Sequence, residues 1–361
     1  MKNTHLQILI PLLAAVALSL PIVCLGGCQF NEEGLRPENN AVPDDQMPEQ
    51  KVTFKDLTVS GSELFHGDKV STKLTVQNQA SRQKTFFIGC SIEDPLGNWY
   101  DLPAEQIVLE VGEKVPVNFV WQVPAENEKE KLTSGPYRLV KAAWSKAPGM
   151  EGAERLAVVE KERAFHVNRA HEDYSSYNEA LWKKSSHPLG LGMLDPDNVK
   201  IEDGLLRITL PAGTYDGGQL ESRKETYLYG SYRARMKLPE APSSITGFFL
   251  YKAPDFYYEV DIEIVNDASG KAWFTTYADG KVSNTYETYL GFDPTADFYE
   301  YRFDFYPGEL SFYVEGRLVK TFDQGLPDQP MKLMINSWFP HWLEGREPEE
   351  DAFTLVDWIK Y

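Results

Sequence analysis

From about residue 52 to the C-terminus, the sequence repeats short runs with apolar residues at alternate positions, and helical periodicity is absent. An alternation of period two is typical of strands that turn one face to a core and the other to solvent. Turn sequences such as Asp94-Pro-Leu-Gly97, Ser134-Gly-Pro136 and Ala278-Asp-Gly280 separate these runs. We therefore expect an all-β chain of antiparallel strands joined by tight turns.

The expected strands fall into two groups. The group over residues 52–168 has short strands with frequent turns, which is typical of an immunoglobulin-like β-sandwich. The group over residues 169–361 is longer and more aromatic, which predicts a large antiparallel sandwich or jelly roll. The expected strands are Thr53–Val59, Ser71–Gln77, Lys84–Ile92, Gln106–Leu109, Lys114–Val123, Tyr137–Trp144 and Ala164–Val167, and then Leu205–Leu210, Gly230–Leu238, Ile245–Tyr251, Tyr257–Val265, Ala272–Tyr277, Phe298–Tyr306, Leu310–Val314 and Lys332–Trp338.

The first group contains no cluster of residues that could catalyse a reaction. A spacer or accessory role is therefore favoured over glycan binding for residues 52–168. Cys90 lies in a strand-like run and is expected to be a small buried apolar residue.

The N-terminal residues predict export and attachment to a membrane. Residues 1–27 have a weakly basic start, an apolar run and small residues before Cys28, which resembles a bacterial lipoprotein signal peptide. Cys28 would be lipidated after cleavage, and residues 28–51 would form a flexible acidic linker. The alternative is an uncleaved membrane helix, but Pro11 and Pro21 interrupt a run that is already short. We expect an extracytoplasmic protein, lipid-anchored to a bacterial membrane.

The net charge of the chain limits the classes of partner that it is expected to bind. Its 36 Lys and Arg against 54 Asp and Glu give a net charge of −18, so nucleic acid and anionic lipid would be repelled. A neutral glycan is favoured over a polyanionic one, although acidic surfaces also simply keep secreted proteins soluble. We expect the chain to act as a monomer.

The most informative strand is Tyr257–Val265, where three carboxylates stand at alternate positions. Glu259, Asp261 and Glu263 are expected on one face with Tyr257, opposite an apolar face. Like charges about 6–7 Å apart repel, and nothing on this strand offsets them. Such a cost is usually tolerated where chemistry uses it, although a solvated polar face would show the same pattern.

Two carboxyl groups on one face can hydrolyse a glycoside if their pKa values diverge. In a retaining enzyme they stand about 5–5.5 Å apart across the scissile bond. The backbones of Glu259 and Glu263 are expected about 13 Å apart, a gap that two long side chains can largely close over a substrate. Asp261 lies between them, where its charge would raise the pKa of one glutamate and keep it protonated.

The motif Glu259-Val-Asp-Ile-Glu263 resembles the signature of glycoside hydrolase family 16, with the regular spacing of its lichenase-like branch of endo-1,3-1,4-β-glucanases. The resemblance implies a concanavalin A-like β-jelly roll that hydrolyses a neutral β-glucan by double displacement with retention of configuration. It extends in order over about residues 172–361 through Tyr174–Lys183, Leu220–Arg223, Tyr229–Tyr232, Gly291–Asp293, Phe303–Gly308, Phe312–Gly316, Asn336–Trp338 and Asp357–Tyr361.

By this resemblance Glu259 is the nucleophile, Asp261 a supporting carboxylate and Glu263 the acid/base. The mechanism requires no cofactor. A structural Ca²⁺ of the kind often held by lichenases would be bound by Asp357 and the carbonyl of Gly204. The positions expected to contact substrate are Glu221, Arg223, Tyr257, Tyr277, Asn336 and Trp338; the last would be a stacking platform or else a core tryptophan.

The chain departs from the lichenase pattern near the motif. Tyr257-Tyr258 replaces the usual Trp-Asp, Thr275 replaces an amide residue, and the loops at Ala253–Phe256 and after Trp338 are shorter. These changes put subsite shape and linkage preference in doubt.

Two alternatives to hydrolysis remain. One is a transglycosylase with the same site, in which a sugar replaces water, and the other is a non-catalytic glycan-binding envelope lipoprotein. The presence of all three carboxylates argues against the second. The histidines show no metal-binding spacing, and His341, beside Trp342, would line either the cleft or the surface.

Overall fold

The computed structural model describes residues 52–125 and 132–361. The predicted signal peptide 1–27, the lipidation site Cys28 and the linker 28–51 lie outside these residues. The regular structure that is described consists of β-strands and one 3-10 turn, Pro196–Asn198, which confirms the all-β prediction. No helix in the two described ranges is long and apolar enough to span a membrane.

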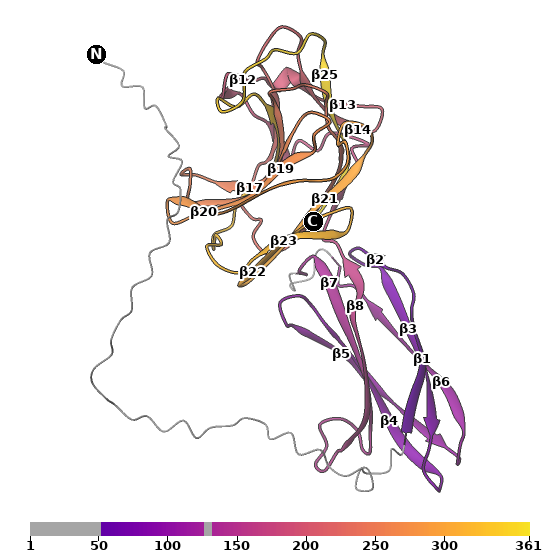
Figure 1. Ribbon diagram of the computed structural model, residues 1–361. Helices are drawn as coiled ribbons and strands as arrows, with labels where there is room; N and C mark the ends of the chain where they lie inside the picture. Colours follow the sequence, from indigo (N-terminus) through magenta and orange to yellow (C-terminus); the bar gives the residue numbers. More distant parts are fainter. Residues whose placement is uncertain (1–51, 126–131) are drawn as a thin grey trace, which may run out of the picture. The chain divides into compact units, whose positions relative to one another are not determined.

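Strands β1 to β8 form an immunoglobulin-like sandwich, as predicted (Figure 1, indigo to magenta). One sheet has the order β1-β3-β6 and the other the order β2-β8-β7-β4-β5, in which only β2 and β8 run parallel. The hydroxyl of Tyr137 donates to the carbonyl of Thr133 at 3.1 Å, as in the tyrosine corner of such domains. The strands are β1 Val52–Val59, β2 Glu63–Leu64, β3 Lys69–Asn78, β4 Lys84–Glu93, β5 Trp99–Leu109, β6 Lys114–Gln122, β7 Gly135–Trp144 and β8 Arg155–Val167.

Strands β5 and β8 are much longer than predicted. β5 is an edge strand and is mostly exposed, so few of its side chains carry the apolar alternation. Pro103 interrupts the pattern, but an edge strand can hold a proline because one side of its backbone needs no partner. β8 is exposed or only partly buried as far as Arg163, which explains why only its buried end was predicted. Cys90 is buried in this core, as predicted.

The remaining strands form two stacked sheets, the jelly-roll sandwich that was predicted. One sheet has seven strands in the order β10-β15-β24-β17-β18-β19-β20, and the other eight, with β13-β14-β25-β16-β21-β22-β23 as its path and β9 paired to β25. Figure 1 shows β17, β19 and β20 in one layer and β21 to β23 in the other. The strands are β9 His171–Glu172, β10 Trp182–Lys184, β11 His187–Leu189, β12 Gly192–Leu194, β13 Val199–Glu202, β14 Leu205–Leu210, β15 Gly218–Ser222, β16 Gly230–Lys237, β17 Ile245–Lys252, β18 Tyr258–Val265, β19 Lys271–Ala278, β20 Lys281–Tyr289, β21 Tyr299–Tyr306, β22 Glu309–Val314, β23 Arg317–Phe322, β24 Lys332–Trp338 and β25 Ala352–Lys360.

The core of the jelly roll fixes the orientation of β18. Val260, Ile262 and Ile264 are fully buried between the two sheets, as the alternation predicted. Each buried side chain of this size stabilises the fold by about 1.5–3 kcal/mol. A register slip of one residue would turn the three carboxylates into the core, so packing on one face holds the acids on the other.

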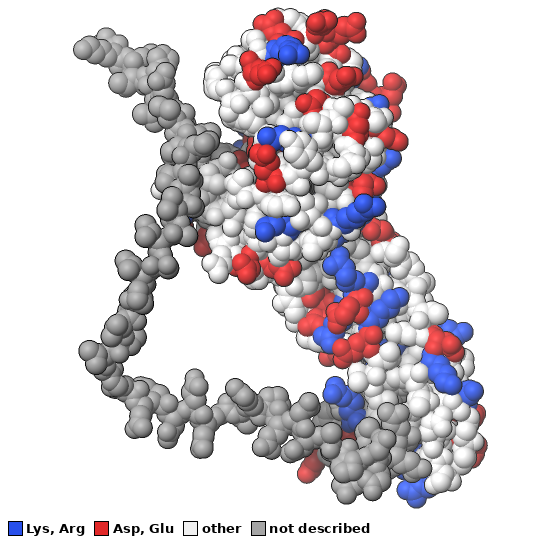
Figure 2. Space-filling model, in the orientation of Figure 1, with Lys and Arg blue, Asp and Glu red and all other residues white. Residues whose placement is uncertain are grey.

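The surface carries charges of both signs. On the face shown in Figure 2, acidic and basic side chains are interspersed.

Candidate active site

The face of the seven-stranded sheet that is turned away from the core lines an open cleft of about 580 Å³. Strand pairing places side chains of this face in rows that cross the sheet, because directly paired residues point to the same side. The rows on β18, β17 and β24 are Glu259 with Tyr251 and Lys332, Asp261 with Phe249 and Met334, and Glu263 with Gly247 and Asn336.

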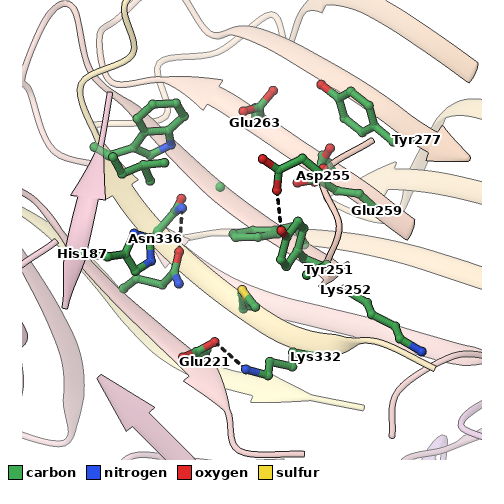
Figure 3. Close-up of a pocket in the computed structure, with 18 of the residues that line it drawn as sticks. His187, Glu221, Tyr251, Lys252, Asp255, Glu259, Glu263, Tyr277, Lys332 and Asn336 are labelled. Atoms are coloured by element: carbon green, nitrogen blue, oxygen red, sulfur yellow. Dashed lines mark hydrogen bonds and ion pairs between the residues drawn. The ribbon is translucent and has the colours of Figure 1, made fainter. Parts of the chain in front are cut away.

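Glu259 and Glu263 extend from the same strand into this cleft (Figure 3). Asp261 lies between them in the sequence, also lines the cleft, and is only 4% exposed. The structure therefore places all three acids on one face, as the sequence predicted.

The surroundings raise the pKa of each of these acids. Burial, and then the neighbouring Glu263 carboxylate, raise the pKa of Glu259 to about 8, whereas a hydrogen bond with Asp261 lowers it. Burial raises the pKa of Glu263 to about 7. Burial, followed by the charges of Glu259 and Glu263, raises the pKa of Asp261 well above its usual value. Glu259 and Glu263 therefore have pKa values close to neutral pH, so they can exchange protons as acid and base.

Asn336 presents an unused acceptor at the cleft. Its Nδ2 donates to Oε1 of Gln219 at 3.1 Å, while its buried Oδ1 has no hydrogen-bond partner in the described part of the chain. A Cβ at Gly247 would lie 2.7 Å from this Oδ1, so the glycine leaves room for it. Buried polar atoms are rarely left unpaired, so Oδ1 is suited to accept a hydrogen bond from a ligand.

Glu221 lines the same cleft but is neutralised. Its carboxylate pairs with Lys183 at 2.5 Å and with Lys332 at 3.1 Å, and Figure 3 shows the pair with Lys332. Carboxylate oxygens can also accept hydrogen bonds from the hydroxyl groups of a ligand.

The short loop before β18 adds residues that the sequence analysis did not identify. The hydroxyl of Tyr251 donates to Oδ1 of Asp255 at 2.5 Å, and both residues line the cleft (Figure 3). Phe256 also lines it, with its ring 5.6 Å from that of Tyr277. Tyr251 could have been identified from the sequence, because Gly247, Phe249 and Tyr251 alternate along the expected strand Ile245–Tyr251.

The other predicted contact residues divide into two sets. Tyr277 and Trp338 line the cleft. Tyr257 precedes β18, is 43% exposed and is not part of the lining. Arg223 is exposed, and its Nε donates to the carbonyl of Glu179 at 2.5 Å, also away from the lining. His341 is exposed outside the lining as well.

The structure shows the surroundings of the two expected calcium ligands. Asp357 pairs with Nη1 of Arg235 at 2.6 Å. The described residues contain no group of three His, Cys, Asp or Glu side chains that could hold a metal, although calcium is also bound by backbone carbonyls and water. Gly204 lies in a turn with φ +74°, and calcium binding stays a prediction.

The second sandwich is similar to known β-glucanases. The family model described as glycosyl hydrolases family 16 matches residues 192–360. A β-glucanase of Paenibacillus polymyxa is 30% identical over 213 residues, covering 55% of this chain and 89% of that protein. A β-glucanase of Bacillus amyloliquefaciens is 30% identical over 205 residues, covering 53% and 85%. The solved Bacillus licheniformis β-glucanase is 28% identical with a TM-score of 0.49, covering 53% of this chain and 96% of that one.

Proposed function

The chain belongs to glycosyl hydrolases family 16, and from this premise we propose that it is a retaining endo-β-glucanase acting on a neutral β-glucan. The observation that carries the proposal is the position of Glu259 and Glu263 on one strand, facing one open cleft with raised pKa values. The lining comes from β15, β24, β17, β18 and β19, which suits an internal segment of a polymer. The related proteins are β-glucanases, which makes a β-glucan the first substrate class to test. The lichenase-like spacing of Glu259-Val-Asp-Ile-Glu263 makes 1,3-1,4-β-glucan the first polymer.

The reaction proceeds by two displacements. Glu259 attacks the anomeric carbon while Glu263 gives its proton to the glycosidic oxygen, so the leaving chain departs as an alcohol. Glu263, now ionised, then removes a proton from water, whose oxygen attacks the anomeric carbon and releases Glu259. Two inversions at this carbon restore the original configuration.

Asp261 and the substrate decide which acid is ionised. With its raised pKa, Asp261 keeps its own proton and donates a hydrogen bond to Glu259, which favours the anionic nucleophile. In the free protein the pKa of Glu259 is raised at least as far as that of Glu263. Positive charge that develops at the anomeric carbon stabilises the ionised form of Glu259. Glu259 rather than Glu263 is therefore the anion in the first displacement.

Other lining residues bind the sugar. Oδ1 of Asn336 and the carboxylate oxygens of Glu221 accept hydrogen bonds from hydroxyl groups. Trp338 and Tyr277 supply aromatic surface to the apolar faces of glucose rings.

The location of the enzyme follows from residues outside the described structure. The signal-peptide pattern of residues 1–27 supports cleavage before Cys28, lipidation of that residue and an extracytoplasmic position at a bacterial membrane. Metabolic labelling with a fatty acid should mark the full chain but not its Cys28→Ser variant. Label that persists in the variant would contradict the assignment. We also propose a monomer, which size-exclusion chromatography with light scattering tests.

The activity is tested on the chain from residue 29 onward with lichenan, laminarin, xyloglucan and galactan. Cleavage of a β-glucan is expected, and Glu259→Ala should lose turnover while keeping the far-UV spectrum and Tm close to those of the parent. Glu160→Ala, at an exposed acid of the first sandwich, is the matched control and should retain full activity. An equally active Glu259→Ala variant would refute the role of that residue. Binding of every polymer without cleavage would favour a glycan-binding protein.

A further inference from the structure

Two tryptophans stand beside Glu263 on the β19 side of β18. Trp273 is the direct cross-strand partner of Glu263, so both side chains point to the cleft face of the sheet. Trp342, from the loop between β24 and β25, packs edge-to-face against Trp273, with ring centroids 4.9 Å apart and an interplanar angle of 81°. Neither residue is part of the cleft lining described above.

The indole of Trp273 is fixed in position. Its Nε1 donates to Oε2 of Glu287 at 2.8 Å, and Glu287 pairs with Lys271 at 3.1 Å. The Lys271 ammonium lies 4.8 Å from the centre of the Trp273 ring. Trp342 is held against this braced ring and is nevertheless 45% exposed. A large apolar side chain that is immobilised and still open to solvent is suited to bind a ligand.

The direction of the glucan follows from the two glutamates. Glu259 and Glu263 are separated along β18 and must act on opposite sides of one bond, so the polymer crosses this strand between them. On one side it passes over β17, β24 and β15, which supply much of the cleft lining. On the other side it passes over β19, between Tyr277 and Trp273.

The two sides have different tasks in a double displacement. The sugar that is bonded to Glu259 must remain bound until water arrives, whereas the leaving segment must depart. The part of the cleft over β17, β24 and β15 has far more of the lining residues than the part over β19, which suits the retained segment. The part over β19, where Tyr277 is the lining residue, then receives the leaving segment.

Building on the proposed function, we infer that Trp342, positioned by Trp273, is a stacking platform for the glucose units on the leaving-group side of the scissile bond. A segment bound there aligns its glycosidic oxygen with Glu263, which lies beside Trp273. The same platform binds an incoming sugar acceptor after the first displacement, so it also sets how often a sugar replaces water.

The inference is tested with two substrates on the chain from residue 29 onward. One is lichenan, and the other is a β-gluco-oligosaccharyl fluoride, whose leaving group is fluoride and contains no sugar. Trp342→Ala should reduce kcat/KM on lichenan about tenfold, mainly through KM, and leave kcat/KM on the fluoride unchanged. It should also reduce the yield of transglycosylation products formed from the fluoride with added cellobiose.

The positioning role of Trp273 needs a separate comparison. Trp273→Ala should show the same pattern as Trp342→Ala, and Trp273→Phe should restore most of the activity on lichenan, because a phenyl ring still supports Trp342. Trp99→Ala is the matched control, since Trp99 is 48% exposed in the first sandwich and its loss should alter neither substrate. Tm measurements exclude variants that fail to fold.

Equal losses on lichenan and on the fluoride, or no loss on lichenan, would overturn the inference. Failure of the unaltered chain to cleave either substrate would instead refute the proposed function. The two failures are therefore distinguishable.

Discussion

Each of the two described sandwiches has a cluster of three carboxylates that can be compared. In the first sandwich, Arg138 pairs with Glu93 at 2.7 Å, Glu160 at 2.5 Å and Glu162 at 2.9 Å. In the cleft of the second, Glu259, Asp261 and Glu263 share one strand face, and no Lys or Arg of the described residues forms an ion pair with them. Both clusters contain three carboxylates, and they differ in whether a cation pairs with them.

The difference separates a structural cluster from a reactive one. The acids around Arg138 share one guanidinium and are partly exposed, so water and salt also screen their charges. Burial raises the pKa of each acid in the cleft, and the neighbouring carboxylates add to this rise for Glu259 and Asp261. Buried acids without a paired cation destabilise the fold. Their raised pKa values, however, allow the proton transfers that hydrolysis needs.

The largest expected effect comes from removing the acid of the cleft cluster. Glu263→Gln should reduce kcat on lichenan by about 10²–10⁴-fold, because the sugar leaving group then departs without a proton. The first displacement on a β-gluco-oligosaccharyl fluoride should be nearly unaffected, since fluoride leaves as an anion. Stopped-flow release of fluoride measures this step. Glu162→Gln, at the other cluster, should change neither rate, and equal losses on both substrates would argue against an acid role.

The second effect is a change in how the free energy of unfolding depends on pH. Because the pKa of Glu259 is about 8 when folded and near 4.5 when unfolded, the folded state binds more protons between these values and loses stability as the pH rises. Glu259→Gln removes this penalty, so it should be more stable than the parent at pH 8 by about 1–3 kcal/mol and no more stable at pH 4. Urea unfolding at the two pH values measures the difference. A variant less stable than the parent at pH 8 would contradict the cost assigned to the cluster.

A smaller effect is expected from filling the space that Gly247 leaves beside Oδ1 of Asn336. Gly247→Ala places a Cβ 2.7 Å from Oδ1 of Asn336 and displaces the amide. We expect a loss of about tenfold in kcat/KM, seen as a higher KM with little change in the pH profile. The matched control is Gly89→Ala in the first sandwich, where the nearest atom to the new Cβ is 3.6 Å away. Full activity of Gly247→Ala would show that Asn336 does not need this space.

The smallest effect is expected from removing the cation of the first cluster. Arg138→Met leaves Glu93, Glu160 and Glu162 uncompensated as well, but water and salt screen them. Tm should fall by about 2 °C or less, and glucan hydrolysis should not change. Differential scanning calorimetry measures the shift. A large fall in Tm or a loss of activity would show that the solvent exposure of the acids around Arg138 does not explain how the two clusters differ.

The sequence predicted the parts of the fold that depend on local alternation. The apolar face of β18 and the acids opposite it followed from side-chain period alone, because Val260, Ile262 and Ile264 are buried on every alternate position. The exposed edge strands were underestimated, as in β5, because their side chains need not alternate. β20 was missed for the same reason, since its residues are exposed or only partly buried.

The parts of the site that depend on distant partners could not be predicted. Glu221 was expected to contact substrate, but its neutralisation by Lys183 and Lys332 depends on three strands meeting in the sheet. The pairing of Asp357 with Arg235 likewise joins residues far apart in the sequence. Tyr257 was assigned to the cleft by extending the alternation one residue too far, because β18 begins at Tyr258.

The central claim is that Glu259 forms a bond to the anomeric carbon while Glu263 supplies the proton. Incubation with a 2-deoxy-2-fluoro-gluco-oligosaccharyl fluoride slows the second displacement and lets the glycosyl-enzyme accumulate, and mass spectrometry of peptides locates the sugar. The account predicts one fluorosugar on the carboxylate of Glu259. A label on Glu263 or Asp261, or products of inverted configuration from an unlabelled protein, would contradict it.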